Sequence, residues 1–434
     1  SMAIIPQKKL FGWTEIQSLG DLERLRLVLE YMPDEELMVT LEGMRKNGRN
    51  DYPVRAMWNS ILAGIVFQHE TVEKLRRELA RNGQLRLICG FDEQIPPPWA
   101  YTRFLRTLMK EELVVVKIFD RLVEEISQVL PCYGKSLAMD SKAIPSFAKH
   151  KNKNQTPDGR RDIDADYGKK EYRGINKEGK AWEKVVKWFG YKLHLIVDST
   201  YELPVFFSLT KASRSDVVEG RKIIEGLKER QPEMFERAEV ITADRGYDDT
   251  KLITTCWDEH RIKPVIDIRN MWQDPDKTRL LSDKENVVYD YKGNVYCYCP
   301  LTGRGRQMLN GGFEKDRGTL KKLCPTKKFG LECRGESKCP VRQGIRIPLA
   351  EDRRVFTPID RSSYKWKAEY NKRTAVERVY SRLDVSFGFE LHTIRGMQKM
   401  KIRCGLALCV MLAMALGRVK EKQGENYCSL VKAV

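Results

Sequence analysis

Several signatures of common enzyme and membrane-protein classes are missing from this 434-residue chain. Its five histidines are scattered, and it contains no HExxH, GxSxG or Walker-type phosphate loop. Zinc-protease, serine-hydrolase and P-loop nucleotide chemistry therefore have no support in the sequence. The only long apolar run near a terminus, residues 404–417, is shorter than the roughly 20 residues that span a bilayer. We expect this run to be a buried helix, and we expect neither a signal peptide nor a membrane span.

The chain is also short of negative charge. It has 78 Lys and Arg against 60 Asp and Glu, a formal net charge of +18. A field of this sign favours a polyanion such as nucleic acid, with an anionic membrane surface as the competing partner. Eleven cysteines without a secretory signal fit a reducing cytosol better than a disulfide framework, which predicts a cytoplasmic protein.

Hydrophobic patterning divides the chain into four parts. Residues 1–130 carry apolar residues at helical spacing, which predicts a helical domain. Its basic clusters, residues 45–49 and 74–81, are either solvated helix faces or DNA contacts, and we expect this domain to bind DNA. Residues 131–270 contain short apolar runs rich in β-forming residues around one amphipathic helix, which predicts the first part of a mixed α/β core. Residues 271–355 lose this periodicity and gain turn residues, cysteine and positive charge, which indicates an inserted module. Residues 356–434 return to a helical pattern and complete the core.

Two of the predicted strands end in aspartate. The apolar run of SLAMD stops at Asp140, and that of VITAD stops at Asp244. A carboxylate at the end of a strand is fixed by the sheet and still open to solvent, which suits a metal ligand. Aspartate is also common in ordinary turns, so neither residue identifies a site by itself.

A third carboxylate lies in YNKRTAVERVYSRLD, residues 370–384. At about 100° per residue, Tyr370, Arg373, Glu377 and Asp384 fall within about 60° of one another on a continuous helix. The simplest interpretation of Arg373 and Glu377 is a surface ion pair worth less than about 1 kcal/mol. Three carboxylates on separate elements of a strongly basic chain are, however, what two hard divalent cations need to act on phosphate esters.

Four segments together resemble the DDE transposases of bacterial insertion sequences, in the group marked by Tyr-x2-Arg-x3-Glu-x6-Lys. They are LAMDSKAI around Asp140, GYKLHLIVD with the following LPVFFSLTKASRSD, ITADRGYDD around Asp244, and YNKRTAVERVYSRL around Glu377. Residues 48–91 also resemble the helical domain that precedes the catalytic domain in many such enzymes.

This resemblance implies a ribonuclease H-like fold in which Asp140, Asp244 and Glu377 bind two Mg²⁺ or Mn²⁺ ions. It implies hydrolysis that frees a 3′-hydroxyl at the element end, followed by attack of that hydroxyl on a target phosphodiester. The implied partners are the element ends and the target DNA, with a homodimer assembled on DNA. The implied location is the bacterial cytoplasm, in association with the nucleoid.

The resemblance also gives roles to neighbours of Glu377. Tyr370 and Arg373 would hold a DNA phosphate, because a guanidinium can grip phosphate oxygens bidentately and a tyrosine adds a hydroxyl or a stacking face. The lysine of the family motif should stand at position 384, where this chain has Asp384. Either Arg378, Arg382 or a more distant base makes that contact, or the contact is absent.

Five cysteines fall within the 271–355 module, which holds 12 Lys and Arg against 4 Asp and Glu between residues 301 and 346. Four of them are candidates for a zinc site that would staple a module too poor in apolar residues to fold alone. These four are Cys299, Cys324, Cys333 and Cys339, and the fifth is Cys297. Free thiols and disulfides formed on oxidation are the alternatives.

The sequence therefore predicts an active DNA transposase. One alternative is a domesticated relative that cuts DNA without inserting it, which the same three acids would serve equally well. Another is a DNA-binding protein that kept the fold and lost catalysis, and the presence of all three acids argues against it. A carbohydrate-active enzyme with paired carboxylates is disfavoured by the charge of +18 and by the scarcity of aromatic residues near the acids.

Overall fold

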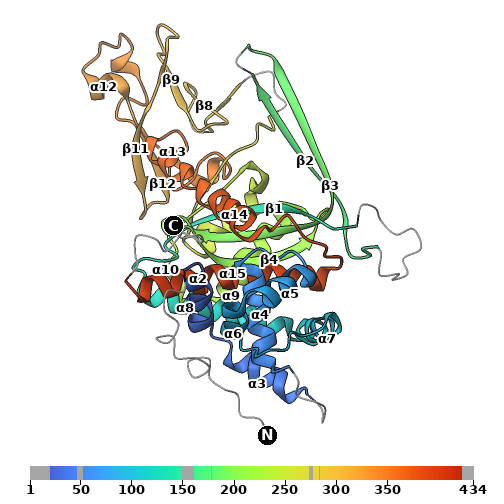
Figure 1. The fold of residues 1–434 in the computed structure, drawn as a ribbon. Helices are drawn as coiled ribbons and strands as arrows, with labels where there is room; N and C mark the ends of the chain where they lie inside the picture. The colour runs from blue at the N-terminus through green and yellow to red at the C-terminus, as the bar shows by residue number, and fades with distance from the viewer. Residues whose placement is uncertain are drawn as a thin grey trace.

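A computed structural model of the chain describes residues 20–45, 52–148, 161–176, 178–272, 277–282 and 284–422. A mixed β-sheet lies at the centre, helices cover both of its faces, and a second, β-rich region extends from one end (Figure 1). The predicted mixed α/β class is confirmed.

The described N-terminal part is helical, as its apolar spacing predicts. Several helices begin at a recognisable cap: the Thr71 hydroxyl accepts a hydrogen bond from Lys74 N at 3.2 Å, and Pro98 opens another helix. The helices are α2 (Leu22–Tyr31), α3 (Glu35–Gly43), α4 (Val54–Val66), α5 (Val72–Arg81), α6 (Gly83–Cys89), α7 (Pro98–Leu108) and α8 (Glu112–Val129).

The central sheet contains six strands in the order β2-β3-β1-β5-β6, with β4 also paired to β3. The β1–β5 and β5–β6 pairs are parallel, and the other pairs are antiparallel. All four residues of β5 are buried, as expected for a parallel strand covered on both faces. The strands are β1 (Ser136–Pro145), β2 (Asp166–Ile175), β3 (Ala181–Asp198), β4 (Leu203–Lys211), β5 (Val240–Ala243) and β6 (Lys263–Ile266).

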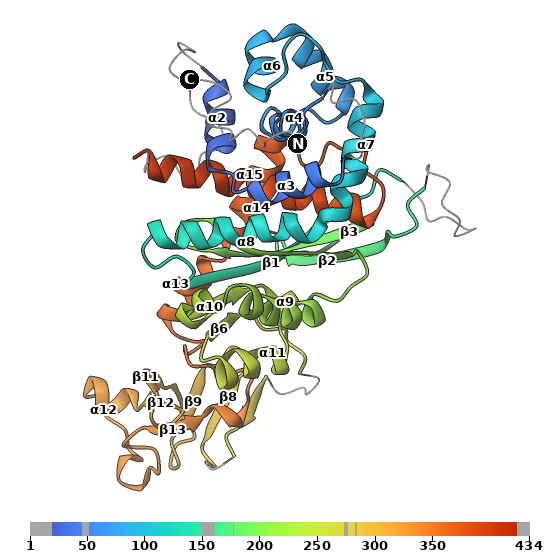
Figure 2. The same cartoon turned by 90° about the horizontal axis from the view of Figure 1, so that it is seen from below.

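Helices form a layer on each face of this sheet. Figure 2 shows α8 and the C-terminal helix α15 (Met397–Lys420) on one side, and α9 (Asp216–Arg230) with α10 (Pro232–Arg237) on the other. Among the described residues, α15 is the one helix long and apolar enough to cross a membrane, but 89% of its apolar window is buried inside the protein. The expectation of a buried helix is confirmed, although the helix is longer than the apolar run from which it was inferred.

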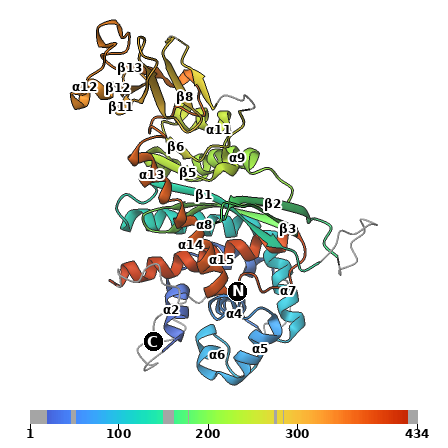
Figure 3. The same ribbon diagram turned by 90° about the horizontal axis from the view of Figure 1, so that it is seen from above.

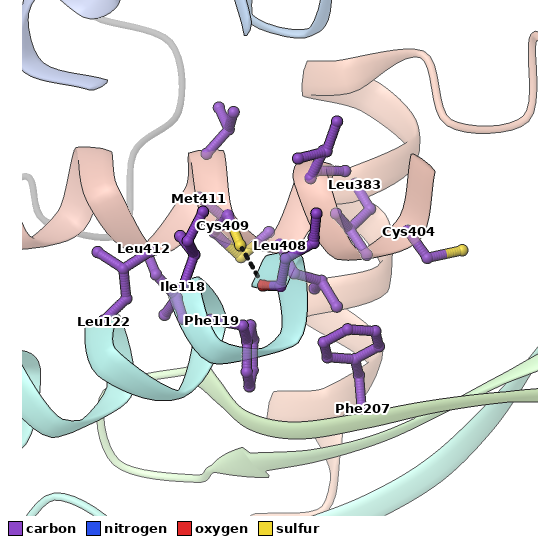
Figure 4. Close-up of a cluster of buried hydrophobic side chains, with 14 of the residues drawn as sticks. Ile118, Phe119, Leu122, Phe207, Leu383, Cys404, Leu408, Cys409, Met411 and Leu412 are labelled. Carbon is purple, nitrogen blue, oxygen red and sulfur yellow. Dashed lines mark hydrogen bonds between the residues drawn. The ribbon is translucent and has the colours of Figure 1, made fainter. Parts of the chain in front are cut away.

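The main hydrophobic core joins the N-terminal helices, the sheet and α15 without interruption. In the close-up of Figure 4, side chains of α8 and α15 interdigitate above β4. The rings of Phe119 and Phe207 meet edge to face with centroids 4.8 Å apart, and Cys409 Sγ lies 3.9 Å from the carbonyl oxygen of Val115. The predicted boundary at residue 130 is therefore crossed by a shared core, and it stays a prediction as a domain limit.

The region between β6 and α13 is better folded than its sequence suggests. It forms a four-stranded sheet in the order β10-β9-β8-β7 and a three-stranded sheet in the order β11-β12-β13. A second buried cluster, which includes Val287, Val295 and Ile347, fills it. Because this cluster also includes Trp257 and Ile268, which precede the module, the view that the module is too poor in apolar residues to fold alone stays a prediction. Its elements are β7 (Thr278–Leu280), β8 (Val287–Asp290), β9 (Val295–Tyr298), β10 (Gly305–Gln307), β11 (Leu309–Glu314), β12 (Thr319–Leu323), α12 (Pro325–Phe329) and β13 (Ile345–Pro348). Figure 3 shows this module at the end of the molecule opposite the N-terminal helices, with the central sheet between them.

The stretch 370–384 is not one continuous helix, contrary to the prediction. Helix α13 (Tyr364–Asn371) ends before α14 (Thr374–Phe387) begins. At the junction, Arg373 N bonds to Tyr370 O and Val376 N to Arg373 O, both at three-residue separation. This tighter, 3₁₀-like winding has about 3.0 residues per turn, so it rotates the side chains away from the even stripe of an α-helix.

The strand β3 is twice as long as the segment predicted from its apolar run, residues 190–198. Its inner half pairs with β1 and β4, and its outer half pairs with β2. A Cβ atom at Gly190, where these halves meet, would lie 2.2 Å from the carbonyl oxygen of Ile144. The residue at this corner must therefore be glycine. Beyond it, β2 and the outer half of β3 leave the sheet as a two-stranded ribbon (Figure 1).

Candidate active site

The register of two parallel strands brings Asp140 and Asp244 together. Met139 pairs with Ala243 in the β1–β5 ladder, so these two aspartates occupy the next position on each strand. Neighbouring strands lie about 4.8 Å apart, and residues at equal register share a face. Asp140 does not end its strand, as the apolar run had suggested, because Ser141 to Pro145 continue to pair with β3. Only the pairing with β5 stops before Asp140.

Backbone amides fix both carboxylates from their own loops. Asp140 Oδ1 accepts a hydrogen bond from Ser141 N at 2.7 Å, and Asp244 Oδ1 accepts one from Gly246 N at 2.8 Å. Burial raises the pKa of Asp140 to about 6; Lys170 opposes this rise and the negative charge of Asp244 adds to it. Two adjacent carboxylates whose negative charges repel form a site with affinity for cations.

Arg373 links Asp140 to Glu377, the third predicted acid. Its Nη1 atom lies 2.8 Å from Glu377 Oε1 and 3.9 Å from Asp140 Oδ2. Glu377 stands in the first turn of α14 with 52% of its side chain exposed, whereas the side chain of Asp140 is only 16% exposed. The predicted Arg373–Glu377 ion pair is thus present, and the same guanidinium also faces the acid on β1.

Tyr370 lies near the end of α13, close to Asp244 and Asp267. Its ring stacks on Trp366 with centroids 4.9 Å apart and an interplanar angle of 11°, and the Arg373 guanidinium carbon lies 5.7 Å from its centroid. Burial raises the pKa of Tyr370, and the charges of Asp267 and Asp244 raise it further. The structure therefore groups Tyr370 and Arg373 with the acids, although the helix that carries them is broken.

Asp384 forms an ion pair with Lys142, a residue to which the sequence analysis gave no role. Lys142 Nζ lies 2.7 Å from Asp384 Oδ2 and 3.2 Å from Glu390 Oε1. Lys142 follows Asp140 by two positions on β1, so the two side chains project from the same face of the sheet. The spacing D-x-K in LAMDSKAI was the available signal for Lys142. Its partner Asp384, however, is 242 residues away in the sequence.

The two arginines considered as replacements for the family lysine are engaged elsewhere. Arg378 Nε lies 2.5 Å from Glu202 Oε1, and Arg382 Nη2 donates a hydrogen bond of 2.6 Å to the Glu202 carbonyl oxygen. Both therefore anchor α14 to the turn between β3 and β4.

Three further residues position the acids and were missed by sequence reasoning. The Tyr380 hydroxyl, one turn after Glu377, lies 2.9 Å from the carbonyl oxygens of Asp140 and Leu193 and seats α14 on β1 and β3. Lys170 Nζ donates a hydrogen bond of 2.8 Å to the Ser141 carbonyl oxygen. Asp267 follows β6, and its carboxylate lies 3.3 Å from Arg245 Nε. The aspartate that directly follows the apolar run in residues 262–266 was a usable signal for the last of these.

A hollow with a volume of about 400 Å³ adjoins the loop of Asp244. Lys192 within it is paired with Asp216 at 3.1 Å, while Arg269 donates hydrogen bonds to the carbonyl oxygens of Arg245 and Gly246. The charged residues that line the hollow are Lys169, Lys192, Arg214, Asp216 and Arg269, and the lining also includes Tyr167 and Gly246. Four cations against one acid make this an electropositive surface beside the acids.

The predicted zinc ligands Cys299, Cys324, Cys333 and Cys339 lie at half-buried positions in the insertion and are not joined in disulfides. Within the described residues, the one group of ligand atoms that lies within 4.8 Å is Glu225, Glu259 and His260, which belongs neither to these thiols nor to the three acids. The zinc site stays a prediction. Metal analysis of protein purified without added zinc would test it, with about one zinc per chain expected.

Comparison with known proteins relates this chain to a protein family and to solved structures. No curated protein matches the chain. One of the similar solved structures is the cryo-EM structure of a piggyBac transposase synaptic complex with hairpin DNA, at 12% identity and a TM-score of 0.38, covering 96% of this chain and 81% of that one. A likeness of this size supports no conclusion about the site. The family model described as "Transposase DDE domain" matches residues 136–413, which is more than half of the chain and includes all three acids. The chain belongs to the DDE transposase family.

Proposed function

We propose that this protein is the DNA transposase of a bacterial insertion sequence, of the Tyr-x2-Arg-x3-Glu group. It would cleave phosphodiester bonds at the element ends and join the 3′-hydroxyl ends to target DNA, acting as a homodimer assembled on DNA in the bacterial cytoplasm. The observation that carries the proposal is the register that sets Asp140 beside Asp244, with Arg373 reaching from Asp140 to Glu377.

Asp140, Asp244 and Glu377 are the residues that would hold the metal, since members of this family generally use divalent ions. The donor set fits Mg²⁺ or Mn²⁺, because it consists of carboxylate oxygens and includes two adjacent acids whose charges repel. When bound, a pair of such ions lowers the pKa of an attacking water or 3′-hydroxyl and stabilises the leaving oxygen.

The protein's own side chains would then bind and orient the DNA. Arg373, whose guanidinium contacts an acid on each side, is placed to grip a phosphate next to the cleaved bond. Tyr370, held flat by Trp366, adds a hydroxyl and a ring face at the same place. The amides of Ser141 and Gly246 hold the carboxylates of Asp140 and Asp244 in position.

The test is to incubate the protein with Mg²⁺ and DNA that carries the terminal repeats flanking its gene, and to map the cut and joined ends. We expect metal-dependent release of a 3′-hydroxyl end, followed by its joining to target DNA. Cleavage without joining would instead indicate the domesticated nuclease, and binding without cleavage would indicate a DNA-binding protein. Reactions with EDTA and with Asp140→Asn protein are the controls.

A further inference from the structure

The ribbon formed by β2 and the outer half of β3 has no role in the proposed catalytic reaction. Its strands pair from Asp166 with Gly190 out to Ile175 with Ala181, whereas β1 and β4 pair with β3 only from Gly190 inwards. In Figure 1 the ribbon rises from the same side of the core as the insertion, with α14 between the two. The two strands of this arm therefore pair only with each other, and not with the strands that carry the acids.

Beyond Trp188 and Phe189, which are buried at its base, this ribbon has exposed side chains on both faces. Tyr167 is 56% exposed, Trp182 45% and Val185 43%. An isolated two-stranded ribbon is at best marginally stable in water, because neither face buries apolar surface. Large aromatic side chains left bare on such an arm mark it as a surface that another molecule covers.

The two faces differ in charge beyond Asp166, whose carboxylate is bound to Ser213 at the base. On one face, the described side chains include Lys170 and Lys184 with Trp182 and Val186, and no acid. On the other face, the described side chains include Lys169 and Lys187 with Glu171 and Glu183, and the register places Arg173 there as well; Lys169 forms an ion pair with Glu171. The first is named the lysine–tryptophan face. It carries two lysines and no acid, whereas the opposite face mixes basic and acidic residues.

The lysine–tryptophan face begins at the acids. Lys170 Nζ bonds to the carbonyl oxygen of Ser141, the residue after Asp140. Lys184 stands one same-face position further out than Lys170, and Trp182 one further than Lys184, opposite Gly174. Since two residues of a strand span about 6.6 Å, a chain of basic and aromatic groups leads outwards from the acids.

We propose that the lysine–tryptophan face of the ribbon binds the duplex DNA that flanks the cleavage point. The proposal rests on the proposed function, which makes DNA the substrate. A two-stranded ribbon fits the major groove, lysines pair with phosphates, and an exposed indole packs on bases or sugars. A second copy of this chain is the less suitable partner, because a formal charge of +18 on each copy disfavours contact between two basic arms.

The experiment compares matched substitutions on the two faces. Lys184→Ala and Trp182→Ala change the lysine–tryptophan face, while Lys187→Ala and Val185→Ala change equally exposed positions on the opposite face of the same strand. Binding to a fluorescein-labelled duplex of the element end, about three helical turns long, is measured by anisotropy at a series of salt concentrations. Thermal unfolding of each variant reports its fold, and light scattering without DNA reports its oligomeric state.

We expect Lys184→Ala to lower the slope of log affinity against log salt by about 0.9, the value of one phosphate contact. Trp182→Ala should weaken binding by about tenfold, and Trp182→Phe should restore most of it, since base stacking is worth roughly 1–3 kcal/mol. The opposite-face variants should bind like the unmodified chain. Equal binding by all variants would overturn the proposal, as would a change of oligomeric state on the lysine–tryptophan face without a change in DNA binding.

Failure of this proposal is distinguishable from failure of the proposed function. If the unmodified protein cuts the element ends and the ribbon variants bind DNA normally, the ribbon proposal fails and the transposase assignment stands. If no metal-dependent cleavage occurs but the two faces still differ in binding, the function fails and the ribbon remains a DNA-binding arm.

Discussion

The three acids are held in two different ways. Asp140 and Asp244 extend from adjacent strands of the buried sheet, and their spacing follows from the pairing of Met139 with Ala243. Glu377 is half-exposed and lies in the first turn of α14, a helix that begins after the interruption that follows α13. The first two positions are set by backbone hydrogen bonds, whereas the third depends on how α14 is seated. Changes that loosen α14 should therefore affect cleavage while leaving the sheet intact.

The largest effect should come from removing a carboxylate charge. Asp140→Asn and Asp244→Asn should each reduce strand cleavage by more than about 100-fold, because loss of even an outer partner of a metal ligand costs about 10–100-fold. DNA binding by anisotropy should stay within about twofold. Glu377→Gln should lose cleavage to the same degree, and a variant that retained it would remove that residue from the set of three.

The buried hydrogen bonds beside the central sheet can be tested at Asp162. This buried carboxylate accepts hydrogen bonds from Ser146 Oγ at 2.6 Å, Tyr191 OH at 2.7 Å and Gly396 N at 2.9 Å. Asp162→Asn should lower the free energy of unfolding by about 2 kcal/mol at pH 7, since hydrogen bonds to a charged group are worth roughly 1.5–3 kcal/mol.

The stability difference between the unmodified protein and Asp162→Asn should depend on pH in a defined direction. Burial by itself would raise the pKa of Asp162, but hydrogen bonds from Gly396, Ser146 and Tyr191 outweigh it and lower the pKa. The stabilisation is then fully present above the unfolded pKa of about 3.9 and is lost as the pH falls through the folded value. Urea unfolding at pH 7 and at pH 3 should show a smaller gap between the two proteins at pH 3. A gap that grew in acid would contradict the assignment.

The seating of α14 can be tested at Tyr380. Tyr380→Phe removes the hydroxyl that contacts the carbonyl oxygens of Asp140 and Leu193. We expect stability to fall by only about 1 kcal/mol and cleavage by about tenfold, because a small displacement of Glu377 misplaces one ligand. Tyr364→Phe, at a position 87% exposed on α13, is the control. Normal cleavage by Tyr380→Phe would show that α14 does not depend on this contact.

The smallest effect should come from the bridge between Lys142 and Asp384. Lys142→Asp and Asp384→Lys each place two like charges together, whereas the double variant restores an opposite pair and returns lysine to the family position. We expect the double variant to recover about 0.5–1 kcal/mol relative to the sum of the singles in denaturant titrations. Additive losses would mean that the bridge does not tie α14 to β1.

The sequence predicted the parts of the site that local patterning encodes. Asp140 and Asp244 were recognisable because an apolar run precedes each, and a buried parallel strand leaves that signal. The break between Asn371 and Thr374 was not recognisable, because no proline or glycine marks it. Lys142 and Asp384 meet only through the tertiary packing of α14 on β1, so neither segment alone indicates the pair.

The ribbon was missed for a related reason. Its residues are exposed on both faces, so the strands lack the apolar alternation from which strands are inferred. In the insertion, by contrast, the buried residues are spread over short strands among turns, and the sequence understated its core.

Gly190 divides β3 into two parts. The ribbon beyond it can change in length, whereas the register of the strands that carry Asp140 and Asp244 cannot. Because the strands beyond this corner pair only with each other, adding two residues to each would extend the arm by about 6.6 Å without shifting Asp140 or Asp244. Adding one residue to each would instead turn the lysine–tryptophan face over at every position further out. Protein engineers and evolution alike could therefore alter the reach of this molecule in steps of two residues while its chemistry stays the same.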